Sequence, residues 1–254
     1  MESKIQLKKI NGTIFFEYET ENNSVKKTLE AYIKKERALG IEKVKLSYAD
    51  LNHTKLEKII LSNYKLSSIN LSYADLREAN FEDADLFSAN LEGADLRGAD
   101  LSNAGLTCAN LINADLRGAY LSGADLREAN LTNANLTNAD LCYVNLLFAN
   151  LRYADLSNSK LKCANLNKSD LTNANFSNSY LYKADLSFSL LINLISINTD
   201  LRFVNLKCSN LSGANLTNAD LKCANLTEAN LTDTDLTNAN LEYADLTKAK
   251  LNKC

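Results

Sequence analysis

From Val44 onward, apolar residues recur every five positions and polar residues fill the gaps between them. The larger apolar residue stands at Leu46 and at every fifth position to Leu251. Of these 42 positions 39 are leucine, and the exceptions are Phe81, Phe176 and Ser196. Two positions earlier lies a second column in which 27 of 42 residues are alanine. The residue between the two is usually Asp or Asn, so the repeating unit reads Ala-(Asp/Asn)-Leu-x-x.

A period of five residues does not fit an α-helix, because leucines at this spacing would scatter around a cylinder of 3.6 residues per turn. The alanine and the leucine are two residues apart, which is the spacing of one face of a strand. The fifth residue has no place in that alternation and indicates a corner. Because packed β-layers lie roughly 10 Å apart, four such sides close a coil around a solid core, with about 20 residues and a rise of about 4.8 Å per coil.

The run SYADLREANFEDADLFSANLEGADLRGADL resembles the pentapeptide-repeat family, and the resemblance extends over residues 41–254. It implies an all-β fold, a right-handed quadrilateral β-helix (a solenoid), here of about ten and a half coils. Some members of this family resemble B-form DNA in size and charge and protect or inhibit DNA gyrase, a type II topoisomerase. Many other members have no assigned activity.

Residues 1–40 precede the repeat and are interpreted as an N-terminal hairpin and capping helix. Asn11-Gly12 between two apolar runs predicts a β-hairpin with a two-residue type I′ turn. Ser24 is placed to cap a helix that Gly40 ends. Its apolar residues at helical spacing are Val25, Leu29, Tyr32 and Ile33. Solenoids need such terminal caps, and a separate ligand-binding module is the alternative.

Two sections depart from the repeat. Residues 54–70 are degenerate, with Ile59, Tyr64 and Ile69 in place of alanine. Residues 187–199 (SFSLLINLISINT) carry Leu and Ile in place of Asp/Asn, and we predict a bulged or distorted side there with apolar residues displaced outward. No amphipathic helix follows the repeat at Leu251, so strand edges and leucines are expected to be exposed. This predicts an end-to-end homodimer through the uncapped C-terminal coil.

Charge and chemistry restrict the function. The net charge is −3 with 23% charged residues, so we expect no direct binding of nucleic acid. No run of 18 apolar residues and no signal-peptide core occur, so we expect a cytoplasmic protein without a membrane span. His53 is the single histidine, and the six cysteines are scattered. We therefore expect no catalytic residues, no metal site, no cofactor and no enzymatic activity.

Two surfaces remain as candidates for binding a protein partner. The leading hypothesis is a non-catalytic interaction or scaffold rod that uses exposed apolar residues. These residues are Tyr143, Leu147, Phe148, Phe188, Leu190, Ile192, Ile195, Ile197 and Phe203.

The alternative is a DNA-mimicking regulator or protector of a topoisomerase such as gyrase. Residues 71–140 contain twelve acids and four arginines, a net charge of −8, against +1 for residues 141–254. The acidic walls of residues 71–140 would present carboxylates to a DNA-binding groove, although their charge is more dilute than that of a duplex. The candidates are Asp75, Asp85, Asp95, Asp100, Asp115 and Asp125.

Overall fold

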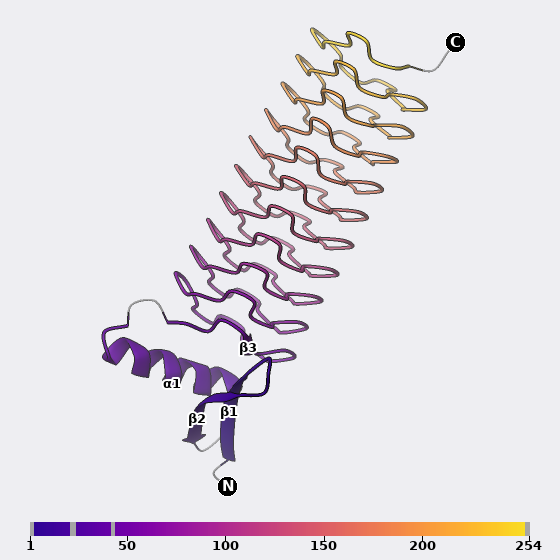
Figure 1. Ribbon diagram of the computed structural model, residues 1–254. Helices are drawn as coiled ribbons and strands as arrows, with labels where there is room; N and C mark the ends of the chain where they lie inside the picture. Colours follow the sequence, from indigo (N-terminus) through magenta and orange to yellow (C-terminus); the bar gives the residue numbers. More distant parts are fainter. Residues whose placement is uncertain (1–2, 21–23, 42–43, 252–254) are drawn as a thin grey trace.

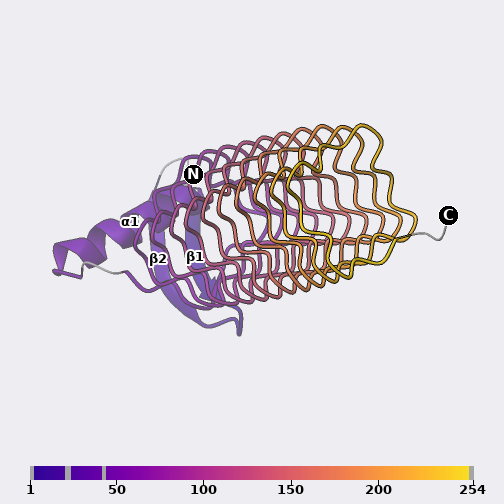
Figure 2. The ribbon, with the colours of Figure 1, turned by 90° about the horizontal axis from the view of Figure 1, so that it is seen from above.

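The computed structural model describes residues 3–20, 24–41 and 44–251. It shows a rod of stacked coils with a hairpin and a helix at its N-terminal end (Figures 1 and 2). In chain order the elements are β1 (Ser3–Lys9), β2 (Ile14–Thr20), α1 (Val25–Ala38) and the short β3 (Ala49–Asp50). Parallel β-bridges then join residues twenty apart, from Lys45↔Lys65 to Asn230↔Lys250. Each coil therefore has four sides of five residues, and the predicted right-handed quadrilateral β-helix is confirmed.

The stacked sides form four walls, which we number in chain order. Wall 1 contains the side of Leu46 and the sides at intervals of twenty residues, wall 2 that of Leu51, wall 3 that of Leu56 and wall 4 that of Leu61. Walls 1 and 3 lie on opposite sides of the rod, as do walls 2 and 4. A residue's place on the surface thus follows from its number, because residues twenty apart lie one above the other.

Neighbouring coils are joined by backbone hydrogen bonds that repeat in every unit. In the unit of Leu151, the leucine N–H donates to the carbonyl of Asp170 in the next coil at 2.7 Å. The N–H of Asp155 donates to Ala134 in the preceding coil at 3.0 Å. These bonds run along the rod axis and hold the coils at the spacing of a parallel sheet.

The corner of each unit is a tight turn that explains the Asp/Asn column. The N–H of Ala154 donates back to Leu151 at 3.1 Å, and Tyr153 has a φ of 59°, as in a type II turn. One N–H, that of Arg152, has no backbone acceptor in this pattern. The Asn150 side chain accepts it at 3.1 Å. An Asp or Asn before each leucine therefore satisfies a backbone donor that the coil geometry leaves over.

The alanine and leucine columns point inward and form one continuous core, from Val44 to Leu231, of almost fully buried side chains. Ile59, Tyr64 and Ile69 of the degenerate section are buried in the same core. Toward the C-terminal end the leucines become partly exposed, and Leu251 is exposed. No helix in the described ranges is long and apolar enough to cross a membrane.

The distortion predicted for residues 187–199 is wrong. The ladder continues through this section without a break, with Leu190 N–H donating to Ser169 and Ile195 N–H to Ala174, both at 3.0 Å. The reason is a compensation of volume inside one unit. Leu194 points inward where alanine is usual, and Ser196 points inward where leucine is usual. Such a swap keeps the total core volume and leaves the backbone in place.

The N-terminal hairpin forms, but its turn differs from the predicted type. Gly12 N–H donates to Lys9 at 2.8 Å, and Gly12 has a φ of 82°, whereas Asn11 is not left-handed. This is the geometry of a type I turn followed by a left-handed glycine, not of a type I′ turn. Asn-Gly is compatible with both turn types. The ladder of the hairpin also has a register shift between Leu7 and Lys8.

The cap is joined to the first coil by packing and by strand pairing. Ser24 caps α1 as predicted, since its Oγ accepts from Lys27 N–H at 3.2 Å. Helix α1 lies beneath the first coil (Figure 1), and its residues Leu29 and Ile33 are buried in the core. Strand β1 also pairs antiparallel with β3. The hairpin thereby covers an edge that the first coil would otherwise expose.

Candidate interaction surfaces

The interior of the coils is filled by leucine and alanine side chains, so a binding site has to lie on a wall or at the cap. At the cap, a cleft of about 320 Å³ lies between α1 and the first coil, and Ile33, Arg37 and Tyr64 are among its lining residues. The guanidinium of Arg37 lies 5.5 Å from the centre of the Tyr64 ring. Within the described residues no three His, Cys, Asp or Glu side chains are grouped as metal ligands would be.

The six candidate carboxylates of the acidic section do not form one wall. Asp75, Asp95 and Asp115 lie on wall 3, whereas Asp85 and Asp125 lie on the opposite wall 1. Asp100 lies on wall 4. A single groove of a DNA-binding enzyme would therefore meet at most three of these side chains on one face.

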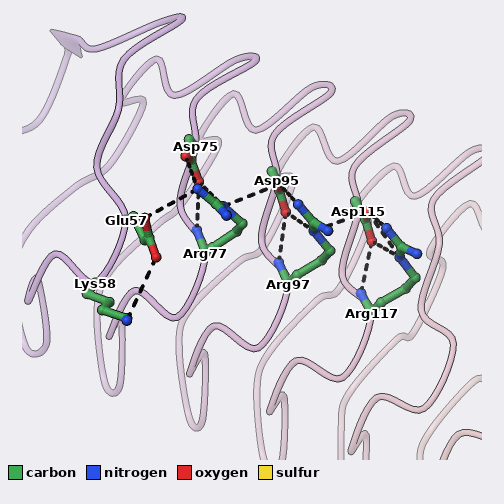
Figure 3. A network of polar contacts seen from close by, with 8 residues as sticks. All are labelled: Glu57, Lys58, Asp75, Arg77, Asp95, Arg97, Asp115 and Arg117. Carbon is green, nitrogen blue, oxygen red and sulfur yellow. Dashed lines mark hydrogen bonds and ion pairs between the residues drawn. The ribbon is translucent and has the colours of Figure 1, made fainter.

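On the lower part of wall 3, Asp75, Asp95 and Asp115 are each neutralised by an arginine of the same unit (Figure 3). Arg97 donates from Nε and Nη2 to the two oxygens of Asp95 at 2.7 and 2.6 Å. Its Nε also lies 3.7 Å from Asp115 of the next coil. The same two-point contact joins Arg77 to Asp75 and Arg117 to Asp115, so the ladder alternates in charge along the rod.

The arginine contacts change the titration of these groups. The Arg77 side chain donates to Asp75 and holds the pKa of that carboxyl below its ordinary value. On wall 1 the side chain of Arg127 donates to Asp125 and lowers its pKa in the same way. Four of the six candidates thus carry an arginine fork: Asp75, Asp95, Asp115 and Asp125. Asp85 and Asp100 are the two without one.

The lower and middle sections of wall 4 carry their charges without such pairs, whereas its last coils contain the pairs Arg202–Asp200 and Lys222–Glu242. Its lower section has Glu82, Asp83, Asp100 and Asp140, which we call the acidic half of wall 4. Its upper section has Lys160, Lys162 and Lys183, which we call the cationic half. Among the described residues none of these seven side chains forms an ion pair. The two halves meet where Asp140 and Lys160 lie on neighbouring rungs, and the other opposite charges of these halves are separated along the rod.

Aromatic rings lie among the lysines of the cationic half. Tyr182 stacks with Tyr180 at 6.1 Å between ring centres and meets the edge of Phe203 at 5.5 Å. Lys183 and Arg202 lie 5.4 and 5.7 Å from the centre of the Tyr182 ring. Tyr180 and Tyr182 are not among the residues predicted from the sequence. Stacking of residues twenty apart could have found them, because it places them on the wall of Tyr143 and Phe203.

The predicted apolar patch is divided by the structure. Tyr143 and Phe203 lie on wall 4, far around the rod from the others. Leu147, Phe148 and Phe188 lie on wall 1, with Phe148 and Phe188 separated by Lys168, whose Nζ is 5.0 Å from the Phe148 ring. Leu190 and Ile192 lie on wall 2, and Ile195 and Ile197 on wall 3.

A smaller group within that patch does lie together, because its members follow one another along a single coil. We call it the apolar band: Phe188, Leu190, Ile192, Ile195 and Ile197. Phe188 is 52% exposed, and Leu190 and Ile195 are each 43% exposed. The band passes from the corner of wall 1 across walls 2 and 3.

The five cysteines in the described residues are free thiols, and Cys254 lies outside them. Burial raises the pKa of Cys142, and Asp140 beside it acts in the same direction. The pKa of Cys108 is raised as well, first by desolvation and then by Glu128. Neither thiol is activated as a nucleophile by this environment.

Comparisons with known proteins agree with the geometry. The family profile "Pentapeptide repeats" matches in 8 copies, over residues 65–103, 104–141, 149–187, 184–222, 197–233 and 219–254. HetL, involved in regulation of heterocyst differentiation in the cyanobacterium Nostoc sp. strain PCC 7120, is 32% identical with a TM-score of 0.48, and the match covers 86% of this chain and 95% of that chain.

Two further solved structures are similar over parts of the chain. Rfr23 from the cyanobacterium Cyanothece 51142 is 34% identical with a TM-score of 0.23, over 39% of this chain and 64% of that chain. QnrB1, a plasmid-mediated fluoroquinolone resistance protein, is 20% identical with a TM-score of 0.38, over 80% of this chain and 90% of that chain. No curated protein matches the sequence.

Proposed function

Because this chain belongs to the pentapeptide-repeat family, whose repeat leaves its walls as the available surface, we propose that it is a non-catalytic protein-binding rod. The partner contacts the apolar band on walls 2 and 3. A cytoplasmic location and the absence of a cofactor remain predictions from the sequence.

The observation that carries this proposal is the replacement of two consecutive Asp/Asn positions by Leu190 and Ile195. Neither side chain has an acceptor to offer the N–H two residues further on, at Ile192 and Ile197. The sequence thus gives up a hydrogen bond worth about 0.5–1.5 kcal/mol at each position. The ladder of hydrogen bonds between coils is unbroken at Leu190 and Ile195, so the exchange is not required by the fold. A sacrifice of stability for exposed apolar surface is typical of a binding site.

The size of the band suits a small set of anchoring contacts. Complete burial of a Leu, Ile or Phe side chain stabilises a complex by about 1.5–3 kcal/mol. Phe188, Leu190 and Ile195 are each about half exposed, so each has part of this energy left for a partner. A few such side chains account for most of the binding energy in many interfaces.

DNA mimicry directed at a topoisomerase receives less support from the geometry. The candidate carboxylates lie on three walls, and four of the six are bound to arginine. Each paired Asp presents a nearly neutral surface to a cationic groove. Under this alternative, binding to gyrase would be salt-sensitive and would be lost in an Asp85→Asn/Asp100→Asn variant.

The test uses substitutions that restore the repeat. Leu190→Asn and Ile195→Asn supply the missing acceptors, so we expect the double variant to be more stable than the wild type in urea unfolding. Nevertheless, when the immobilised chain is used to capture the partner from an extract of its host, the double variant should capture at least tenfold less partner than the wild type. Ile60→Asn is the matched control, since Ile60 is an exposed residue at the same position of a distant unit.

The proposal is supported when the same protein binds the wild type and the Ile60→Asn control and its purified form binds the double variant at least tenfold more weakly. Equal affinity for the double variant contradicts it. Phe188→Ser, which removes an anchor without changing the Asp/Asn column, should weaken binding in the same direction.

A further inference from the structure

Wall 4 is complementary to itself when a second copy of the chain lies against it in the opposite direction. Its acidic half lies below its cationic half, and no arginine binds an acid of the acidic half; Arg202 of the same wall binds Asp200, one coil above the proposed contact. The two copies are related by a twofold axis that lies in the plane of contact and is perpendicular to the rod. This axis reverses the height of each residue along the rod and leaves its position across the wall unchanged. Each residue of wall 4 therefore meets a residue from the same column of the other copy.

One register brings unlike groups together at every height. In this register the axis passes between the side of Tyr120 and the side of Asp140. The coil that contains residue 80 then faces the coil of the other copy that contains residue 180. In the same way, the coil of residue 100 faces the coil of residue 160. Asp100 then meets Lys160, and Asp83 meets Lys183. Both pairs occur twice in the dimer, because the axis relates the two copies.

The centre of the same register is also complementary. Tyr120, an exposed side chain, faces Asp140, so its hydroxyl is placed to donate to the carboxylate. The exposed ring of Tyr143 faces Gly123, which has no side chain to obstruct it. Glu82 faces the hydroxyl of Tyr182 in the next coil outward.

The flanking corner contributes no repulsion in this arrangement. Its arginines Arg77, Arg97 and Arg117 face Ser177, Ser157 and Thr137 of the other copy. Neighbouring registers are unfavourable. A shift by one coil in one direction places Asp140 against Asp140, and a shift in the other direction places Asp140 against Asp100. The charges thus select one register by attraction and exclude its neighbours by repulsion.

We propose that wall 4 is a self-association surface that forms an antiparallel, twofold-symmetric dimer in this register. Six coils give a contact about 29 Å long, and a side of five residues is about 15 Å wide. The two copies bury on the order of 900 Å² together, which is below the range of stable specific interfaces and within that of weak, transient ones. The dimer is therefore weak, with a dissociation constant in the micromolar range, and salt weakens it further.

This dimer is separate from the proposed function. The apolar band begins at the corner between walls 1 and 2 and crosses walls 2 and 3, so it remains exposed on both copies. One dimer would carry two bands, which raises the apparent affinity for a partner with two sites. The end-to-end contact predicted for the C-terminal coil uses neither surface.

Charge reversal distinguishes this dimer from other assemblies. Sedimentation velocity of the full chain should show dimer at tens of micromolar in low salt and monomer in high salt. Lys160→Asp/Lys183→Asp places like charges in four contacts and should raise the dissociation constant at least tenfold, as should Asp83→Lys/Asp100→Lys. The variant with all four substitutions restores every pair and should dimerise like the wild type. Lys207→Asp on wall 1, with no ion pair among the described residues, is the matched control.

The register has its own test. Asn103 faces Cys163 of the other copy, whereas Asn103 and Cys163 of one chain, and each residue and its own symmetry mate, are offset by three coils, about 14 Å. Asn103→Cys should therefore give a covalent dimer with a short bismaleimide, and Asn103→Cys/Cys163→Ser should not.

A monomer at several hundred micromolar in low salt overturns the proposal, as does loss of the dimer in both double variants without recovery in the fourfold variant. A dimer that is unaffected by the charge substitutions on wall 4 and is lost on Leu246→Lys in the last coil also overturns it. Binding of an acidic peptide by the lysines without self-association also overturns it. Circular dichroism of each variant confirms that the coils remain folded.

Discussion

Walls 3 and 4 have the same backbone and the same core, but their charged side chains are arranged differently. On wall 3 an arginine follows Asp75, Asp95 and Asp115 by two residues, and the two bind within one unit. On wall 4 the residue in that place is serine, cysteine or another uncharged or acidic residue throughout the acidic half. One position in five thus decides whether a wall satisfies its own charges or presents them to another molecule.

The core beneath the two walls should not distinguish them. Leu96 on wall 3 and Leu101 on wall 4 are both completely buried. We expect Leu96→Ala and Leu101→Ala each to lower the free energy of unfolding by about 2–5 kcal/mol. Urea unfolding followed by circular dichroism measures both. A difference between them of more than about 1 kcal/mol would show that the outward charges affect the packing inside.

The aspartate columns should respond differently to loss of charge. Asp115 accepts both the Arg117 fork and the Arg117 N–H, whereas Asp100 accepts the N–H of Ser102 at 3.0 Å. Alanine at either position removes the backbone acceptor, and we expect a loss of about 1 kcal/mol. Asparagine keeps that acceptor, so Asp100→Asn should be nearly neutral while Asp115→Asn loses about 0.5 kcal/mol. Equal effects of the two asparagine variants would contradict the contrast between the walls.

The smallest effect concerns pH. The pKa of Asp75 is lower in the folded chain than in the unfolded chain, because the Arg77 side chain donates to the carboxylate. Its contribution is therefore complete above the ordinary Asp value and is lost as the pH falls below about 4. Solvent screening keeps it under about 1 kcal/mol. We expect Asp75→Asn to be less stable than the wild type at pH 6 and to lose less stability between pH 5 and pH 2, as measured by urea midpoints.

Much of the fold follows from the sequence, because the spacing of five residues and the sizes of Leu and Ala leave few ways to close a coil. The role of the Asp/Asn column does not follow from the spacing. It requires knowing which N–H remains after the ladder and the turn have formed, as at Arg152. The pairing of β1 with β3 joins segments with no shared pattern, so the sequence does not predict it either.

The candidate surfaces were harder to predict for a related reason. The net charge was summed over residues 71–140 along the sequence. This sum combined Asp85 with Asp95, although these residues lie on opposite walls. The apolar patch joined Tyr143 to Ile195 in the same way. The first error treats neighbours in sequence as neighbours in space, and the second combines exposed residues of different walls, whereas the coil makes neighbours of residues twenty apart.

The left-handed corner has a consequence for how such a rod changes over time. Tyr153, Lys168 and Glu228 all hold it at a φ of about 60°, although their side chains have little in common. Because the hydrogen bonds of the coil fix this conformation, an outward side chain can be exchanged while the rungs above and below stay where they are. The residue number thus sets both the height of a side chain along the rod and the direction in which it points. New surface contacts can therefore arise by single substitutions that leave the neighbouring positions unchanged.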